Sequence, residues 1–530
     1  MRRLVAVSLL TVCGLVVTAP PASAAPLTLG PVTKASGLSP FTAGCGGPGE
    51  AASTSVNYLN AEVEAHLADD PTNADTLAGA WQQDRWNDGG AHGNVHAYSH
   101  DGGLTWTVNS PLFSRCAGGT ATSAVEATTG APRPSDYQRA TDPWVSYGPD
   151  GRLHAIAIGF DNSTPRNAIL TAYSDDDGAT WSAPREVRFD NPRALGNNFN
   201  DKETLTADPG DADLVYATWQ RIVSPSERSS SKAYENSVSY FSDIWFARST
   251  DGGDSWEPAH SIFSPGRLQQ TIGNQVVVLP DEDGTLINGF NRIQAVSNRD
   301  KQRGYNVEII RSTDKGLTWS APIHIDRLLV SEVTDPNPDA FCPDPAEAGA
   351  CPVRTGDIIP DFAVDRGSNP ATRGNLYAMW MDARFTDGTH DDILLSRSTN
   401  GGLTWSAPVV VDRTPRGVDA FTAAVDVDAT GRVAVSYYDF RNDVPDTPGN
   451  AELSTDLWIT HSPDGGVTFP DESRLTETSF DMRTAPYARG YFVGDYTGLS
   501  HFNGRFDSLW VGANTGNLTN RTDAFHRSAQ

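Results

Sequence analysis

The sequence predicts an all-β fold: a single β-propeller of four-stranded blades, with seven blades favoured and six as the alternative. Three observations support this prediction. One turn sequence recurs six times, an alternating apolar run precedes each copy, and the last unit shows three strands where the others show four. Such repetition at a spacing of tens of residues is typical of ring-shaped repeat folds.

The repeated turn is best seen at residues 311–319, "RSTDKGLTW". Close copies are "RSTDGGDSW" at 248 and "RSTNGGLTW" at 397, and looser ones stand at 98, 173 and 461. Asp can hydrogen-bond to backbone amides inside a turn, and Gly adopts the positive φ that the turn needs. We therefore expect a hairpin at each copy, with the terminal Trp packed back over it.

Apolar alternating runs surround each copy, and alternation with β-branched and aromatic residues indicates strands. The unit at 357–412 shows four of them: "DIIPDFAVD", "NLYAMWMDAR", "DILLSRS" and "SAPVVVD". Units begin near residues 61, 141, 200, 273, 357, 419 and 490. The last has three strands, and "LTLGPVTKA" near the mature N-terminus is expected to complete it and close the ring.

The chain is predicted to be exported. Arg2 and Arg3 precede an apolar run that ends in Ala22, Ser23 and Ala24, which is typical of a secretory signal peptide over residues 1–24. Residues 25–530 then form one domain, and no later segment is apolar enough to span a membrane. We expect a secreted, extracellular protein.

Cysteine count and charge agree with export. Cys45, Cys116, Cys342 and Cys351 remain after the leader, and an even number in an exported chain favours disulfides. Cys342 and Cys351 bracket a short loop, which leaves Cys45 for Cys116. The net charge of −26 argues against a nucleic-acid partner.

The recurrent pattern S-x-D-x-G-x-T-W is the Asp-box, and the chain resembles the sialidase superfamily of Asp-box (BNR-repeat) propellers over its whole mature length. Ser312, Asp314, Gly316, Thr318 and Trp319 match the pattern fully. The resemblance implies that the boxes lie on the back face and that substrate binds at the front, near the axis. It also implies an enzyme, a glycoside hydrolase acting as an exo-sialidase on terminal acidic sugars of glycans.

Arginines are the expected substrate ligands, because guanidinium groups bind carboxylates with two hydrogen bonds. Arg85, Arg292, Arg384 and Arg441 follow the second strand of their units, as does Arg221. For any one of them, a brace to a neighbouring carboxylate such as Asp84, Asp382 or Asp439 is the more common role.

The catalytic candidates come from the same resemblance. Tyr496 in "YTGL" matches the sialidase nucleophile in position, and Glu62 or Glu203 would take its proton. Asp84 and Asp88 are equal candidates for the acid/base. Glu64 shares the strand face of Glu62.

Two departures from the family keep other functions open. The first unit reads "AEVEAHLA" where sialidases carry Arg-Ile-Pro, so Arg139, Arg354 or Arg489 would have to supply the missing arginine, and seven blades exceed the six of sialidases. The alternatives are a hydrolase or lyase acting on uronic-acid glycans and a non-catalytic propeller that binds glycans or proteins. No cofactor is predicted; the acidic turns at 175 and 281 suit a structural calcium ion, although a solvated turn is the more common state.

Overall fold

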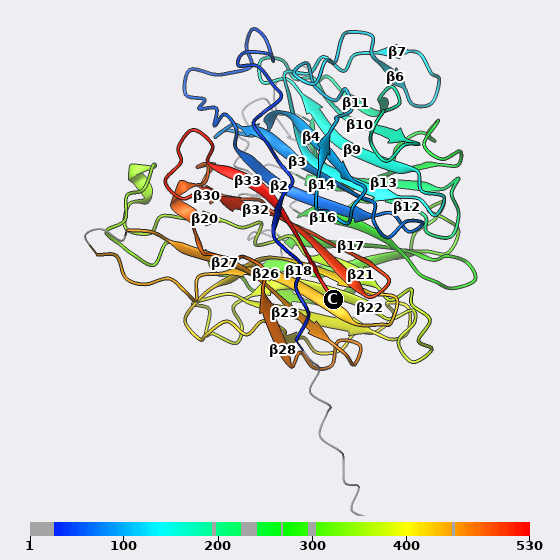
Figure 1. Cartoon of the computed structure of the whole chain (residues 1–530). Helices are drawn as coiled ribbons and strands as arrows, with labels where there is room; N and C mark the ends of the chain where they lie inside the picture. Colours follow the sequence, from blue (N-terminus) through cyan, green and yellow to red (C-terminus); the bar gives the residue numbers. More distant parts are fainter. Residues whose placement is uncertain (1–25, 193–197, 224–240, 267–268, 295–303, 448–450) are drawn as a thin grey trace, which may run out of the picture.

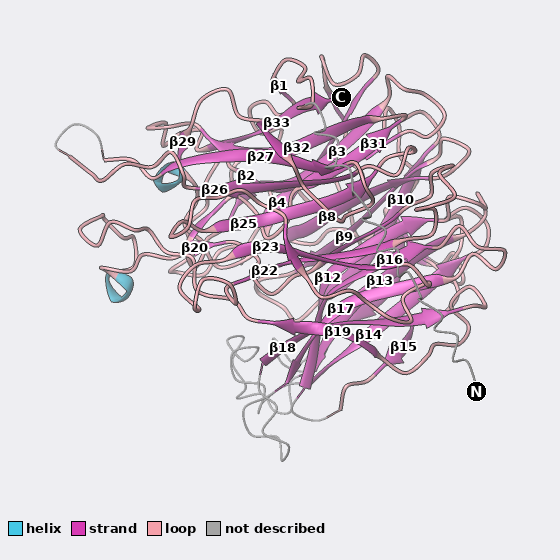
Figure 2. Cartoon of the chain, turned by 90° about the horizontal axis from the view of Figure 1, so that it is seen from below, coloured by secondary structure: helices cyan, strands magenta, loops and turns pink. Residues whose placement is uncertain are grey.

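The computed structural model describes residues 26–192, 198–223, 241–266, 269–294, 304–447 and 451–530. The predicted signal peptide lies outside these residues. Nearly all of the regular structure is β (Figure 2), and the strands pair into antiparallel sheets around a common axis (Figure 1). The all-β propeller prediction is confirmed.

The strands fall into seven sets of four in the described part of the chain. The first strands are β2 (Glu62–Asp69), β8 (Arg139–Tyr147), β12 (Asn198–Ala207), β16 (Gln269–Val278), β21 (Asp361–Val364), β25 (Ala420–Val427) and β31 (Gly498–Phe502). The second strands are β3 (Leu77–Arg85), β9 (Leu153–Phe160), β13 (Val215–Val223), β17 (Leu286–Gln294), β22 (Leu376–Asp382), β26 (Val433–Asp439) and β32 (Arg505–Ala513).

The outer half of each set completes the sheet. The third strands are β4 (Ala91–Ser99), β10 (Asn167–Ser174), β14 (Phe241–Ser249), β18 (Gly304–Ser312), β23 (Asp392–Ser398), β27 (Ser454–Ser462) and β33 (Thr522–Ala529). The fourth strands are β5 (Thr107–Val108), β11 (Arg185–Asp190), β15 (His260–Phe263), β19 (Ile323–Leu328), β24 (Val409–Val410), β28 (Asp471–Arg474) and β1 (Thr33–Lys34).

The loops that connect the sets of strands contain further short elements. They are β6 (Ala124–Glu126), β7 (Pro132–Arg133), β20 (Val353–Arg354), β29 (Phe480–Asp481), β30 (Tyr491–Phe492) and the 3-10 turns η2 (Pro345–Glu347) and η3 (Met482–Thr484). Figure 2 shows both helical turns on one side of the sheets. Parallel pairing of β20 with β30 joins the loop before β21 to the loop before β31.

The ring closes through the N-terminal segment, as predicted. Thr33 and Lys34 pair with His526 and Phe525 of β33, so the blue start of the described chain runs beside its red end in Figure 1. The first strands contact one another in chain order, and β31 contacts β2. One pair, Ala91 with Ala140, links the first two sets into a single hydrogen-bonded sheet, so the count of seven blades stays a prediction.

Each Asp-box ties its own hairpin. In the copy at 311–319, the Asp314 carboxylate accepts from Ser312 Oγ at 2.8 Å, from Thr318 N at 2.8 Å and from Thr318 Oγ1 at 2.6 Å. The amide of Gly316 donates back to Ser312 Oγ at 2.8 Å. These bonds give partners to backbone amides and hydroxyl groups that would otherwise have none inside the turn. The repeated Asp is therefore a structural residue.

The first strands of the seven sets surround the axis and are called the axial strands below. The pairing of the strands places each Asp-box at the end of its blade that is opposite the first residues of the axial strand. Ser312, which opens the box, pairs with Leu286, and Leu286 pairs with Val278 at the end of β16. The end of the blade where β16 begins therefore lies opposite the box.

Replacement of Asp314 by alanine is expected to lower the free energy of unfolding by about 1 to 2 kcal/mol, because a solvent-facing turn loses several modest hydrogen bonds. Asp314→Asn should cost less, since Asn400 in the fifth copy keeps the bonds to Ser398 and Thr404. Urea denaturation measures both. Equal losses, or any loss of activity, would contradict a purely structural role.

Both disulfides form as predicted. Cys45 bonds to Cys116, and Cys342 bonds to Cys351. The second closes the loop that leads into β20. The core between the sets contains large aromatic side chains of the second strands, among them Trp81, Trp219, Trp380, Tyr437 and Trp510, each at most 2% exposed.

Candidate active site

Five of the seven axial strands carry a β-bulge near their first residues. In each, the pairing with the second strand skips two residues, and the first of the two has a left-handed backbone with φ between 44° and 66°. Bulges re-aim side chains and are frequent beside active sites. The skipped pairs are Glu64 with Ala65, Asp142 with Pro143, Lys202 with Glu203, Gly273 with Asn274, and Thr422 with Ala423.

Only Gly273 suits this backbone without strain. A residue with a Cβ atom loses about 1 to 2 kcal/mol in the left-handed region, and strained residues of this kind cluster at functional sites. Glu64, Asp142 and Lys202 all adopt it. The bulges thus bring three charged side chains from three sets to one end of the axis.

Lys202 is enclosed by carboxylates. Its Nζ lies 2.9 Å from Glu64 Oε1, 2.8 Å from Asp495 Oδ2 and 3.5 Å from Asp142 Oδ1. The lysine side chain is 10% exposed and the carboxylates are at most 5% exposed. Burial alone would lower the pKa of Lys202, but Asp142, Asp495 and Glu64 raise it well above its usual value. The lysine therefore carries its charge inside the protein.

The carboxyl groups of Glu64, Asp142 and Asp495 around Lys202 are called the cage below. Asp495 joins this cage to an arginine. Arg354 Nε donates to Asp495 Oδ1 at 2.9 Å, and its Nη2 contacts the other oxygen. Burial opposes ionisation, but Arg354 and Lys202 bring the pKa of Asp495 well below its usual value. The guanidinium groups of Arg354 and Arg85 lie 4.2 Å and 5.0 Å from the ring centroid of Phe492.

The pKa values of Asp142 and Glu203 are shifted in opposite directions. Burial favours the neutral form of Asp142, yet Lys202 lowers the pKa of this carboxyl below its usual value. Burial raises the pKa of Glu203 well above its usual value, and the charge of Asp142 raises it further. The surroundings therefore favour the ionised form of Asp142 and the protonated form of Glu203.

Tyr496 lies beside these groups, and no carboxylate of the described residues is a hydrogen-bond partner of its hydroxyl. The hydroxyl donates to the carbonyl oxygen of Pro143 at 3.1 Å, and the ring lies 5.6 Å from that of Trp144. Burial and the carboxylates of Glu64 and Asp142 raise the pKa of Tyr496 well above 10. The phenol is therefore held protonated.

A cavity of about 340 Å³ follows the axis from these residues. Asp142, Lys202, Glu203, Asp495 and Tyr496 line it, together with the stacked rings of His66 and Trp144, whose centroids are 3.6 Å apart. Its size is within the range of small-molecule sites. Two carboxyl groups with pKa values shifted in opposite directions thus share a cavity with an aromatic wall.

Of the predicted catalytic carboxylates, Glu203 alone lines this cavity. Glu62 is fully buried and accepts from Gln83 at 3.0 Å. Asp84 accepts from Ser39 Oγ and Asn60 N, both at 2.7 Å, and contacts His92 Nδ1 at 3.0 Å. These bonds anchor the loop 39–60.

Asp88 lies at the rim of the same loop. It pairs with Arg139 Nη1 at 2.7 Å and also accepts from Ser55 Oγ. Arg139, a candidate for the missing sialidase arginine, is thereby tied to the loop.

The predicted arginine ligands are mostly paired within their own sets. Arg292 bonds to Glu308 of its own set at 2.7 Å. Arg384 bonds to Asp382 of its own set and to Asp326 of the preceding set, each at 2.8 Å. Arg441 contacts Asp439 and Glu472. Among the predicted ligands, Arg85 contacts Gln82, which in turn donates to Glu64 beside Lys202.

Sequence reasoning missed Asp142, Lys202 and Asp495 as site residues. Two signals were present: Pro143 and Gly273 interrupt runs that otherwise indicate axial strands, and both residue types in a strand interior suggest a bulge. The positions of the other bulges carry no comparable sequence signal.

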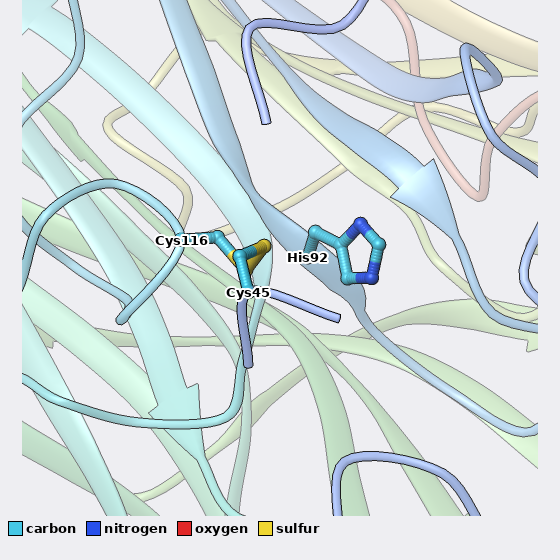
Figure 3. Close-up of side chains that lie close together, drawn as sticks. All are labelled: Cys45, His92 and Cys116. Atoms are coloured by element: carbon cyan, nitrogen blue, oxygen red, sulfur yellow. A yellow bond between two sulfur atoms is a disulfide. The ribbon is translucent and has the colours of Figure 1, made fainter. Parts of the chain in front are cut away.

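One grouping of metal-ligating residue types occurs in the described part of the chain: Cys45, His92 and Cys116 (Figure 3). The two cysteines bond to each other, and His92 contacts Asp84, so this group is a structural one. In the acidic turns predicted to suit calcium, Asp176 anchors an Asp-box and Asp281 accepts from Thr285 N at 2.8 Å.

No family model and no curated protein matches the chain. Among solved structures it is similar in fold to the Hadza microbial sialidase Hz136, with a TM-score of 0.44, 16% identity and coverage of 73% of this chain and 65% of that one. It is also similar to a Trypanosoma rangeli sialidase, with a TM-score of 0.41, 14% identity and coverage of 77% of this chain and 56% of that one. The chain thus spans less than two thirds of either sialidase.

An α-L-arabinanase of Penicillium chrysogenum, solved with arabinobiose, gives a TM-score of 0.42, 13% identity and coverage of 72% of this chain and 94% of that one. Length and hydropathy also decide whether a helix can span a membrane: among the described residues, no helix is long and apolar enough to cross a bilayer.

Proposed function

We propose that this protein is a glycoside hydrolase that uses Asp142 and Glu203 as its catalytic pair. The observation that carries the proposal is that two carboxyl groups at neighbouring bulges line one cavity in surroundings that favour opposite states: Lys202 contacts Asp142 at 3.5 Å and favours its ionised form, whereas both oxygens of Glu203 are buried without a partner among the described residues, which favours its protonated form. Cleavage of a glycosidic bond commonly needs one carboxyl group of each kind, and environments that push two pKa values apart indicate the assignment of acid and base.

The roles follow from the protonation states. Glu203 donates its proton to the oxygen of the departing group. Asp142, kept ionised by Lys202, acts on the anomeric carbon either directly as a nucleophile or through a water molecule. The rings of Trp144 and Tyr496 offer the C–H face of a sugar an apolar wall.

Glycans are the proposed substrates because the Asp-boxes resemble those of the sialidase superfamily. Export is proposed with them: two disulfides support an oxidising compartment.

The narrower second candidate is an exo-sialidase with Tyr496 as nucleophile. It is favoured by the position of Tyr496 in the cavity and by Lys202 and Arg354 nearby, which can attract an acidic sugar. Against it, the phenol has no carboxylate at hydrogen-bonding distance among the described residues, and Arg354 is occupied by Asp495.

Tyr496→Phe separates the two candidates. We expect the variant to keep at least about a tenth of wild-type kcat/KM, because it loses one hydrogen bond worth about 1 kcal/mol. The assay measures fluorophore release from 4-methylumbelliferyl glycosides of neutral sugars, uronic acids and sialic acid.

Hydrolysis of the sialoside with a loss of at least about 10³-fold in Tyr496→Phe would establish the exo-sialidase instead. Failure of the wild type to hydrolyse any glycoside in the panel would contradict both candidates.

A further inference from the structure

Three buried side chains that line the central cavity have polar atoms without a hydrogen-bond partner in the described part of the protein. One is the hydroxyl of Tyr147 at the last residue of β8, and the other two, Glu203 and Asn274, lie at the bulges of β12 and β16. Both oxygens of Glu203 and both polar atoms of the Asn274 amide are unpaired. Glu203 is 2% exposed and Asn274 0%, and both line the cavity. Leaving such groups unpaired costs about 1 to 3 kcal/mol each, so their retention points to a ligand.

The two residues are equivalent positions of neighbouring bulges. Each is the second skipped residue, Glu203 in β12 and Asn274 in β16. Thr204 Oγ1 donates to the backbone carbonyl of Asn274 at 2.9 Å, which fixes the two strands to each other. Their side chains thus form one polar patch on the cavity wall.

The hydrogen-bonding capacity of this patch matches hydroxyl groups. Asn274 offers two donors and one acceptor, and a protonated Glu203 offers one donor together with acceptors. A hydroxyl group both donates and accepts, so adjacent hydroxyls of a sugar ring satisfy both residues.

The charges of the cavity argue against an acidic sugar. Six carboxyl groups line it, against three cationic residues, Lys202, Arg366 and His501. Lys202 and His501 are ion-paired with carboxylates, and Arg366 donates to the carbonyl of Val278. The carboxyl groups belong to Asp69, Asp142, Glu203, Asp361, Asp426 and Asp495.

We propose that Asn274 and Glu203 bind hydroxyl groups of an uncharged sugar ring that enters the cavity, so that the substrate ends in a neutral sugar. This inference rests on the proposed hydrolase and names its substrate class. It separates the protein from enzymes that act on sialic or uronic acids.

The test is binding of free sugars, which needs no catalysis. Xylose, arabinose, galactose, glucose and mannose are compared with glucuronic acid and N-acetylneuraminic acid by isothermal titration calorimetry and by the shift in Tm. We expect at least one neutral sugar to bind the wild type and neither acid to do so. Asn274→Leu should weaken that binding at least about tenfold, because a buried polar contact is lost.

Stability gives a second readout that a structural role would not produce. Asn274→Leu removes unpaired polar atoms, so its Tm should equal or exceed that of the wild type. The matched control is Asn288→Leu, also fully buried and away from the cavity lining. Its Nδ2 is unpaired like the amide of Asn274, but its Oδ1 accepts from Thr218 Oγ1 at 3.0 Å, a bond that the leucine would remove. This control should lower Tm and leave sugar binding unchanged. Asn274→Ala, read by the same titration, replaces the leucine variant if that variant does not fold.

Binding of the acids alone, equal binding by Asn274→Leu and wild type, or binding of no sugar would each overturn the inference. Its failure can be told from failure of the proposed function. Asn274-dependent binding without hydrolysis of any glycoside supports the inference and contradicts the hydrolase. Glu203-dependent hydrolysis of an acidic glycoside supports the hydrolase and overturns the inference.

Discussion

Replacement of Glu203 by glutamine is expected to lower kcat/KM about 10² to 10⁴-fold on glycosides with a poor leaving group, the range that general acid catalysis contributes. The physical reason is the loss of the acidic proton that burial favours on Glu203. Glutamine keeps the size of the side chain, so substrate binding and folding should change little.

The pH dependence of the same variant is a sharper readout. Wild-type kcat/KM should fall as pH rises through the raised pKa of Glu203, and this alkaline limb should be absent from Glu203→Gln. The native protein also holds a proton that the unfolded chain releases above its usual pKa of 4.5. Wild-type stability should therefore decline from about pH 4.5 up to the native pKa, and the variant should lack this contribution.

Glu62→Gln is the matched control. Glu62 is also fully buried with its pKa raised well above the usual value, by burial and by Asp523, but it does not line the cavity. We expect kcat/KM of this variant within about threefold of the wild type, as for a change remote from the reacting groups. An equal loss in both glutamine variants would mean that Glu203 acts through the fold.

Lys202→Met is expected to lower the free energy of unfolding by about 3 to 5 kcal/mol, because it leaves buried carboxylates without their counter-charge. Removal of the cation also removes the main influence that keeps the pKa of Asp142 low. The acid limb of the activity profile should therefore move to higher pH. Urea denaturation and the pH dependence of kcat/KM measure the two effects.

Lys34→Met is the control for loss of a charge. Lys34 pairs with Asp523 at 3.4 Å with a side chain 48% exposed, and surface pairs contribute about 0 to 1 kcal/mol. A similarly small change in the free energy of unfolding for Lys202→Met would show that the contacts between Lys202 and the cage contribute little to stability. Addition of Asp142→Asn to Lys202→Met should recover part of the stability, since it removes the buried carboxylate whose ionised form Lys202 favours.

Much of the fold could be predicted because its signals are local. Asp, Gly and Trp at fixed offsets mark each hairpin, and alternation marks the strands beside it. The closing strand near Thr33 could be predicted because the last unit was one strand short. These signals depend on short stretches of sequence, so they can be recognised without knowledge of the tertiary structure.

The site could be predicted less well, because it depends on where register shifts. Alternation indicates which face a side chain occupies but not where a bulge re-aims it, so Asp142 and Lys202 gave no sign of meeting across 60 positions. Tyr496 and Glu203 were found through a family resemblance. The second-strand arginines misled because their recurrence reflects repeated pairing, as with Arg384 and Asp382.

The measurement that tests the central claim most directly is the leaving-group dependence of Glu203→Gln. A 2,4-dinitrophenyl glycoside needs no protonation to depart, whereas an alkyl glycoside of the same sugar does. We predict that the variant hydrolyses the dinitrophenyl substrate within about tenfold of the wild-type kcat/KM and loses about 10² to 10⁴-fold on the alkyl substrate. Equal losses on both substrates, or no loss on either, would contradict the assignment of Glu203 as the general acid.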